Sequence, residues 1–170
     1  MTDRRASASN KLRVGWREWV GLTDLGVAGI KAKIDTGART SVLHAFAIEP
    51  FRRKGATWVR FEVHPIQRSS AIKIKCEARV IDERAVRNSG GRVERRYIIE
   101  TPLRLGDCVW PIELALANRD QMGFRMLLGR TALDGRALIE PGRSFLVGHH
   151  PPRLRQWLAW IGVEPRKALP

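Results

Sequence analysis

The sequence predicts a mainly β protein whose strands close into a barrel. Runs of alternating apolar and polar residues recur along the chain, as in Thr57 to His64 and Val93 to Leu105, and a period of two is typical of half-buried strands. Turn signals separate these runs, the strongest being Asn88-Ser89-Gly90-Gly91. The chain has 170 residues, 44% of them hydrophobic, which suits a single domain with its own core.

The first half of the chain is expected to consist of strands joined by short connections. Leu12, Val14 and Trp16 alternate with arginines, and Ile30, Ala32 and Ile34 alternate with lysines, so each set predicts one buried strand face. We expect a disordered tail over 1–10, strands over 11–20, 30–34, 40–48 and 57–64, a turn over 21–29 and a basic loop over 50–55.

The second half is expected to contain two hairpins, followed by smaller elements. The first hairpin joins 71–87 to 93–105, and the second turns at Leu105-Gly106-Asp107 into a strand over 108–117. The remaining expectations are a loop over 119–123, a short buried strand over 125–128, a short helix over 131–134, brief strands over 137–140 and 144–147, and an amphipathic C-terminal extension over 151–170. The predicted domain therefore spans 11–150.

The composition of the chain indicates where the protein is located and the state of its cysteines. No apolar run reaches the ~20 residues of a membrane span, and the polar N-terminus lacks the apolar segment of a signal peptide, so a cytoplasmic location without membrane association is expected. Cys76 and Cys108 are too few for a disulfide framework, and we expect both to be free and buried.

The net charge of +14, from 31 Lys and Arg against 17 Asp and Glu, predicts a positive field that attracts anionic partners. Nucleic acid and acidic polypeptide are the two candidates. No repeat of basic and aromatic residues surrounds the six tryptophans, so the sequence itself indicates no base-stacking surface, and nucleic acid is the less favoured partner.

The stretch Asp35-Thr36-Gly37-Ala38 is the leading candidate for chemistry. It follows an alternating strand, so the strand would deliver the Asp35 carboxylate into a turn. Gly37 has no Cβ and allows close approach of another backbone, and the Thr36 hydroxyl can bridge to a neighbour. An acid at the end of a strand beside a glycine suits a carboxylate aimed into a cleft.

A second segment strengthens this reading: Met126-Leu127-Leu128-Gly129-Arg130-Thr131-Ala132-Leu133. Together the two segments resemble the Asp-Thr-Gly-Ala loop and the Ile-Ile-Gly-Arg-Asn-Leu-Leu segment of retropepsins. The wider sequence is closer still to the RimB-like group, a bacterial and archaeal family that carries the name ATP-dependent zinc protease and often neighbours ATP-grasp glutamate ligases of the RimK type. The resemblance covers roughly residues 12 to 148 and implies a retropepsin-like closed barrel with a short helix after Gly129-Arg130.

The resemblance implies an aspartic peptidase in which Asp35, Thr36 and Gly37 form the catalytic loop. Such enzymes need two carboxylates that share one proton, but Asp107 and Asp134 lack the required turn. A single loop in a short chain implies a symmetric homodimer in which each copy supplies one Asp35.

The resemblance also implies a substrate and the residues that bind it. Retropepsins usually carry acidic residues after Asp-Thr-Gly-Ala, whereas this chain has Arg39 and Thr40 there, so Arg130 lacks its usual acidic neighbour. The hairpin from Arg84 to Arg96 corresponds to the flap that closes over substrate, and its arms are basic. These features suggest an acidic or glutamate-extended peptide bound by Ala38, Arg39, Arg84, Arg87, Arg95 and Arg130. The alternative is that the arginines form a solvated face or pair with Glu94 and Glu100.

No cofactor is expected. The sequence contains no His-Glu-x-x-His zinc motif, and its four histidines are His44, His64, His149 and His150. Adjacent His149 and His150 would point to opposite faces of a strand. A Gly-rich phosphate loop ending in Gly-Lys is also absent, so any ATP requirement would belong to a partner such as a glutamate ligase.

Two alternatives to the peptidase remain open. In one, the chain is a basic nucleic-acid-binding β domain in which Asp35 is structural. In the other, the retropepsin-like fold serves as a regulatory binding module for a ligase without turnover.

Overall fold

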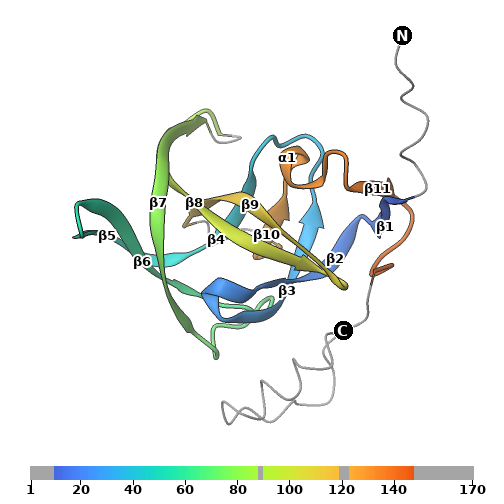
Figure 1. The fold of residues 1–170 in the computed structure, drawn as a ribbon, viewed down its shortest axis with the longest axis horizontal. Helices are drawn as coiled ribbons and strands as arrows, with labels where there is room; N and C mark the ends of the chain where they lie inside the picture. Colours follow the sequence, from blue (N-terminus) through green and yellow to red (C-terminus); the bar gives the residue numbers. More distant parts are fainter. Residues whose placement is uncertain (1–9, 88–89, 119–122, 148–170) are drawn as a thin grey trace.

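The computed structural model describes residues 10–87, 90–118 and 123–147 (Figure 1). Strands dominate this part of the chain, and the α-helix α1 (Arg130–Leu133) is a single turn directly after Gly129. The predicted mainly β class is confirmed. In the described ranges, no helix has both the length and the apolar content needed to cross a membrane.

Six strands form a closed barrel. In spatial order they are β2 (Arg17–Leu22), β3 (Val27–Ile34), β10 (Met126–Leu128), β4 (Ser41–His44), β9 (Cys108–Ala117) and β8 (Val93–Leu105). The ring closes where β8 returns to β2, with Leu22 opposite Leu103. Closure leaves these strands without free edges, and the predicted barrel is confirmed.

The core fills the barrel with aliphatic side chains from every wall. Each strand contributes alternate residues, as the period of two requires. Fully buried members include Leu22, Ile30, Leu43, Ile99, Leu103, Leu114, Met126 and Leu128. Burial of these side chains supplies the main favourable term in folding.

Three strands extend the sheet beyond β8. They are β7 (Ile74–Arg87), β6 (Ala56–Val63) and β5 (Phe46–Arg53). The expected basic loop over 50–55 is wrong, because β5 continues to Arg53 and pairs with β6 across a tight turn at Lys54 and Gly55. Both turn residues have positive φ values of 48° and 78°, so the reversal takes two residues instead of six.

The N-terminal region forms two strands where we expected one. β1 (Leu12–Gly15) pairs in parallel with β11 (Ala137–Glu140), whereas β2 pairs with β3. The break falls at Trp16, whose N–H donates to the Arg143 carbonyl and whose own carbonyl accepts from the Ile34 N–H. Tertiary hydrogen bonds therefore divide a continuous alternating pattern between two sheets.

The chain between β2 and β3 is shorter than the expected turn over 21–29. β2 runs to Leu22, a 3₁₀ turn covers Thr23–Leu25, and Gly26 has a positive φ of 70° before β3 begins. The expected strand over 40–48 is likewise divided into β4 and β5, and Ala47 has a positive φ of 47° beside the register shift in β5.

The expected strand over 144–147 is also wrong, because this segment is irregular. The buried carboxylate of Glu18 accepts hydrogen bonds from the N–H groups of Gly15, Leu146 and Val147. This carboxylate satisfies backbone donors that a strand partner would otherwise take.

The two cysteines differ in environment, so the expectation that both are buried is wrong for one of them. Cys108 is exposed, whereas Cys76 is 3% exposed and its thiol contacts the Leu25 carbonyl at 3.3 Å. Burial raises the pKa of the Cys76 thiol from 9.0 to about 12, which keeps it protonated and unreactive.

We therefore expect a thiol reagent at about pH 8 to label Cys108 rapidly and Cys76 only on unfolding. Because the folded-state pKa of Cys76 is raised, its contribution to stability is complete below 9.0 and is lost as the pH rises from there toward about 12. Mass spectrometry of the labelled protein measures how fast each of the two thiols reacts. Rapid labelling of a folded Cys108→Ser variant would contradict it.

Candidate active site

The Asp35 loop begins where two strands end side by side. β3 and β10 run in parallel with Ile34 opposite Leu128, and the Asp35 N–H extends this pairing by donating to the Leu128 carbonyl at 2.8 Å. The two sequence motifs are thus adjacent in space, although more than ninety positions separate Asp35 from Gly129 (129 − 35 = 94). The barrel holds their strand ends rigidly together.

The Asp35 carboxylate is half-buried and tied to its own loop. Its Oδ1 accepts hydrogen bonds from the N–H groups of Gly37 at 3.1 Å and Ala38 at 3.2 Å. Within the described residues nothing donates to Oδ2. One carboxylate oxygen is therefore fixed, and the other is available to a water, a substrate or a second carboxylate.

The α1 segment fixes the second half of the loop. The Arg130 N–H donates to the Ala38 carbonyl at 2.8 Å, and both the N–H and the hydroxyl of Thr131 donate to the Arg39 carbonyl at 3.1 and 2.9 Å. The Gly129 N–H donates to the Ser41 hydroxyl at 3.0 Å. These four hydrogen bonds join residues 38–41 to the segment that begins at Gly129.

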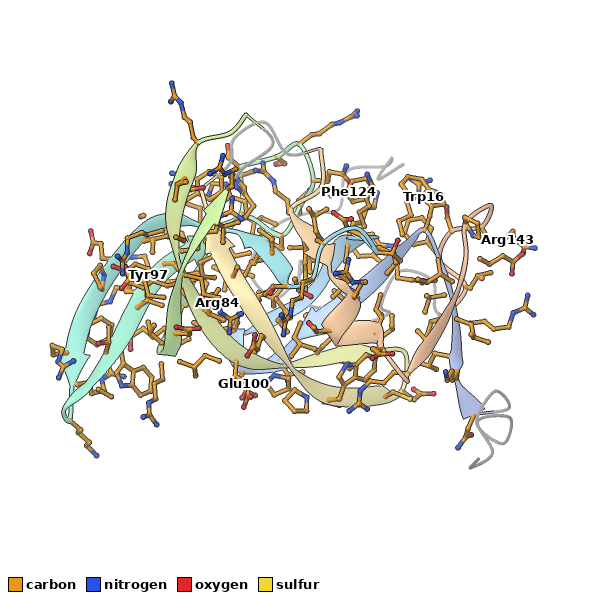
Figure 2. The ribbon with its side chains drawn as sticks, turned by 90° about the horizontal axis from the view of Figure 1, so that it is seen from above. Trp16, Arg84, Tyr97, Glu100, Phe124 and Arg143 are labelled. Atoms are coloured by element: carbon orange, nitrogen blue, oxygen red, sulfur yellow. The ribbon has the colours of Figure 1, made fainter. Side chains whose placement is uncertain are left out.

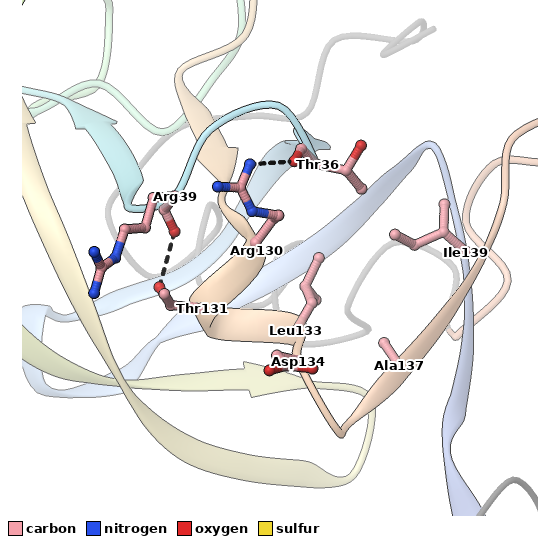
Figure 3. A pocket seen from close by; sticks show the side chains of 8 residues that line it. All are labelled: Thr36, Arg39, Arg130, Thr131, Leu133, Asp134, Ala137 and Ile139. Atoms are coloured by element: carbon pink, nitrogen blue, oxygen red, sulfur yellow. Dashed lines mark hydrogen bonds between the residues drawn. The ribbon is translucent and has the colours of Figure 1, made fainter.

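The Arg130 guanidinium has no acidic neighbour in the loop and bonds backbone carbonyl groups instead. Its Nη1 donates to the carbonyls of Thr36 at 2.8 Å and Gly37 at 3.0 Å; Figure 3 shows the first of these bonds. The Arg130 side chain therefore stabilises the backbone of the Asp35 loop. This contact explains why Arg130 tolerates Arg39 at a position where retropepsins usually have an acid.

An open cavity of ≈ 590 Å³ lies beside this loop (Figure 3). It brings together the loop, α1 and the first part of β11. The residues that line it are Thr36, Arg39, Arg130, Thr131, Leu133, Asp134, Ala137 and Ile139. The cavity therefore combines cationic and apolar walls.

The structure separates the arginines that we assigned to substrate binding. Arg39 and Arg130 lie at the loop, whereas Arg84, Arg87 and Arg95 lie on the β7–β8 hairpin, which pairs through Arg87 and Val93. Figure 2 shows Arg84 on this hairpin.

Carboxylates neutralise much of the hairpin's charge. Arg84 bonds Glu113 at 2.8 Å and Asp82 at 2.6 Å, and these partners raise its pKa. Arg95 bonds Glu83 at 2.8 Å, which raises its pKa too. These guanidiniums would have to exchange partners to hold a substrate carboxylate.

The alternative that hairpin arginines pair with Glu94 and Glu100 holds in part. Arg96, 4% exposed along its side chain, bonds Glu94 at 3.1 Å, whereas Glu100 forms no ion pair with any described residue. Across the described ranges, Arg39 and Arg87 also lack ion-pair partners. No described carboxylate engages either guanidinium, and Arg39 also lines the cavity.

The described histidines do not form a metal centre. His44 and His64 are both buried and pack on the Phe46 ring, at centroid distances of 4.2 and 4.0 Å. Among the described residues, no group of three or more His, Cys, Asp or Glu side chains could hold a metal ion. His149 and His150 lie outside the described ranges.

Sequence reasoning missed several supports of the loop. The Ser41 hydroxyl accepts a hydrogen bond from the Gly129 N–H, and Thr131 donates to the Arg39 carbonyl of the loop. Trp16 caps the end of β3 through its carbonyl. Figure 2 shows Trp16 beside Phe124, with ring centroids 5.8 Å apart. The Thr-Ser pair after Arg39 was a visible signal for local backbone bonding. The contacts made by Trp16 had no local signal.

The closed barrel, the Asp-Thr-Gly loop and the helical turn after Gly129 define a retropepsin-like domain. The match with known proteins is more specific: residues 13–150 fit the family described as RimB-like, "Retropepsin-like aspartic endopeptidase RimB". The chain belongs to this family, and the resemblance found in the sequence is confirmed.

Curated relatives carry a different name. The chain is 49% identical over 141 residues to a "Probable alpha-L-glutamate ligase" of Shewanella halifaxensis, and 51% identical over 140 residues to a protein of the same name from Parasynechococcus marenigrum. These matches cover 83% and 82% of this chain. The chain spans only 31% and 30% of those relatives' own lengths.

A solved structure shares the fold. It is the protein Lpg0085 of Legionella pneumophila, whose function is unknown, with a TM-score of 0.68 and 27% sequence identity. The similarity covers 80% of this chain and 98% of that protein.

Proposed function

We propose that this protein is an aspartic peptidase that works as a homodimer, with one Asp35 from each copy. The observation that carries this proposal is the Asp35 carboxylate, which has one oxygen fixed by the Gly37 and Ala38 N–H groups and the other without a donor among the described residues. The family description supports the reaction class.

In the proposed mechanism the two Asp35 carboxylates share one proton. Like charges at close range oppose double ionisation, so one carboxyl stays protonated while the other remains a carboxylate. The carboxylate takes a proton from water as that water attacks the peptide carbonyl carbon, and the protonated partner donates to the carbonyl oxygen. The C–N bond of the resulting diol then breaks as the first Asp35 gives its proton to the amine nitrogen and the second takes a proton from a diol hydroxyl, which restores the starting pair. Thr36 and Gly37, which are exposed beside the carboxylate, would contact the partner loop and the substrate backbone.

The surface beside the loop suits contact with a second copy. Leu138 and Ile139 of β11 are 46% and 37% exposed, and Ile139 lines the same cavity as Thr36. Apolar side chains exposed next to an incomplete site favour a protein interface, and a two-fold axis at the loop would bring both carboxylates together.

We further propose an acidic or glutamate-extended peptide as the substrate. The exposed Arg39 borders the cavity and has no ion-pair partner among the described residues, and arginine matches carboxylate geometry well. The relatives named as glutamate ligases support this choice, because the product of a glutamate ligase carries added glutamate. Ala38, Arg84, Arg87 and Arg95 remain candidates for further substrate contacts, and Arg130 holds the loop.

Replacing Arg39 with glutamine is expected to raise the KM for an acidic peptide about five- to thirtyfold while leaving kcat nearly unchanged. The lost interaction is one charge-assisted hydrogen bond, worth roughly 1–2 kcal/mol. Steady-state kinetics with an acidic and a neutral peptide measures this, and Arg143→Gln removes an exposed arginine that does not line the cavity. Equal changes for both peptides, or for both variants, would contradict the assignment.

A specific observation favours the second candidate function, a binding module for a ligase. In the curated relatives a region similar to this chain makes up about a third of a protein named as a glutamate ligase. In that role the domain would bind a ligase or its product without cleavage.

The experiment that tests the proposed function is cleavage of a glutamate-extended peptide, followed by mass spectrometry with and without EDTA. Cleavage that EDTA leaves unchanged is the expected result. Cleavage that EDTA abolishes would favour a metal-dependent reaction. No cleavage by the purified dimer, together with tight binding of the peptide, would favour the binding module.

A further inference from the structure

A second candidate site lies on the outer face of the β5–β6–β7 extension. Across these strands Phe51 lies opposite Trp58, and Trp58 lies opposite Arg79. Directly paired residues share a face of the sheet. The side chains of Val59 and Phe61 are buried on the opposite face, so this row points away from the core. We call it, with Arg53 and Arg60, the β5–β7 face.

Arginines lie over both aromatic rings of this face. The Arg53 guanidinium is 4.7 Å from the Trp58 ring centre and 5.0 Å from that of Phe51. The Arg60 guanidinium is 4.9 Å from the Phe51 ring. Stacked guanidinium and aromatic planes are pre-organised and lose little freedom when a further planar group is added.

One carboxylate orients the two arginines and offsets only one of their two charges. Glu77 accepts hydrogen bonds from Arg53 at 2.7 Å and from Arg60 at 3.0 Å, and these bonds hold the pKa of Glu77 below its usual range. Two guanidiniums on one carboxylate leave a positive charge. Their side chains remain 42% and 55% exposed.

Further cations surround this stack. Arg79 is exposed and has no ion-pair partner in the described parts of the chain. Lys54, at the β5–β6 turn, is exposed as well, whereas Arg52 pairs with Thr57 and so lies on the opposite face of the sheet. The face thus presents aromatic planes within a field of positive charge.

We propose that the β5–β7 face binds single-stranded nucleic acid, a function separate from that of the Asp35 loop. Exposed β-sheet faces that combine aromatic rings and arginine planes stack unpaired bases, and surrounding cations hold the phosphates. The charge complementarity is with a polyanion. The half-exposed planar groups favour a partner with flat rings over an acidic polypeptide, whose carboxylates need only the cations. The net charge of +14 supports the same partner through long-range attraction.

The proposed face is remote from the candidate active site. In Figure 1, β5 and β6 lie at one end of the molecule and β1 and β11 at the other, with α1 between them. A dimer formed at the Asp35 loops would leave both β5–β7 faces accessible. Nucleic acid could therefore bind without blocking the loop.

The test is fluorescence anisotropy of a labelled oligouridylate of about 12 nucleotides, within the range that such surfaces bind, over a series of salt concentrations with the full chain. Trp58→Leu keeps an apolar group in place and is expected to weaken binding about tenfold, because a stacked base is lost. Arg79→Gln is expected to lower the slope of log affinity against log salt by about 0.7, because one phosphate contact is lost.

Arg136→Gln is the matched control, because it removes an exposed arginine that lies 5.2 Å from the Trp110 ring centre elsewhere in the fold. It is expected to leave tight binding intact, as is Asp35→Asn, and thermal melts confirm that each variant is folded. Three results would overturn the proposal: no binding by the wild type at low salt, equal losses in Arg79→Gln and Arg136→Gln, or displacement of the oligonucleotide by polyglutamate at lower concentration than by unlabelled oligouridylate.

Discussion

Asp35→Asn is expected to reduce peptide cleavage by about a thousandfold or more, with no loss of fold. An amide can neither take a proton from water nor share one with a partner carboxylate, and acid–base catalysis of this kind contributes about 10²–10⁴-fold. The amide oxygen can still accept the hydrogen bonds that the Gly37 and Ala38 N–H groups donate to Oδ1. The loop should therefore keep its shape while its chemistry is lost.

The measurement is cleavage of a glutamate-extended peptide by wild type and variant, with circular dichroism as the check on folding. Asp134→Asn is the matched control, since Asp134 is an exposed carboxylate that lines the neighbouring cavity but lies outside the loop. Mixing an excess of Asp35→Asn protein with wild type should also suppress activity, because mixed dimers lack one carboxylate. Full activity in Asp35→Asn, or equal loss in Asp134→Asn, would contradict the proposed role.

Gly129→Ala is expected to lower the free energy of unfolding by about 1–3 kcal/mol and to abolish most activity. A Cβ at this position would lie 2.6 Å from the Thr40 carbonyl carbon and 2.7 Å from the Arg39 carbonyl oxygen. Both neighbours are backbone atoms and cannot rotate away. The added methyl group would push apart the loop and the α1 segment, which supports it through the Arg130 and Thr131 hydrogen bonds.

Urea denaturation and peptide cleavage measure the two effects of Gly129→Ala. Gly142→Ala is the control, because a Cβ there meets no atom within 4 Å and the backbone does not have a positive φ. Its stability should stay close to that of the wild type or rise slightly, since alanine restricts the unfolded chain. A Gly129→Ala protein that unfolds and cleaves like the wild type would show that the two motifs do not depend on this contact.

Local patterns in the sequence predicted most of the fold. The bounds of β8, β9 and β11 agree with the expected strands over 93–105, 108–117 and 137–140, because regular alternation between turn residues is a local property. Errors arose where distant groups intervened. Arg143 and Ile34 divide the N-terminal strand at Trp16, and Glu18 supplies the partners that an irregular 144–147 segment needs.

The candidate site divides in the same way. The Asp-Thr-Gly and Leu-Leu-Gly-Arg motifs were visible in the sequence, and the parallel pairing of β3 with β10 places them together. The assignment of hairpin arginines to substrate was less complete, because cross-strand neighbours such as Glu83 and Glu113 engage Arg95 and Arg84. The residue types along one strand do not show which charged side chains on the neighbouring strand lie opposite them.

The family, the β class and the candidate carboxylate could be read from the amino-acid sequence, because each rests on residue types at fixed local spacing. Three features became visible only in the folded chain. They are the arginines without ion pairs among the described residues, the need for glycine at position 129, and the row of Phe51, Trp58 and Arg79 on an outer face. These properties depend on distances between atoms far apart in the chain. Strand pairing and barrel closure set those distances, and no local pattern encodes them.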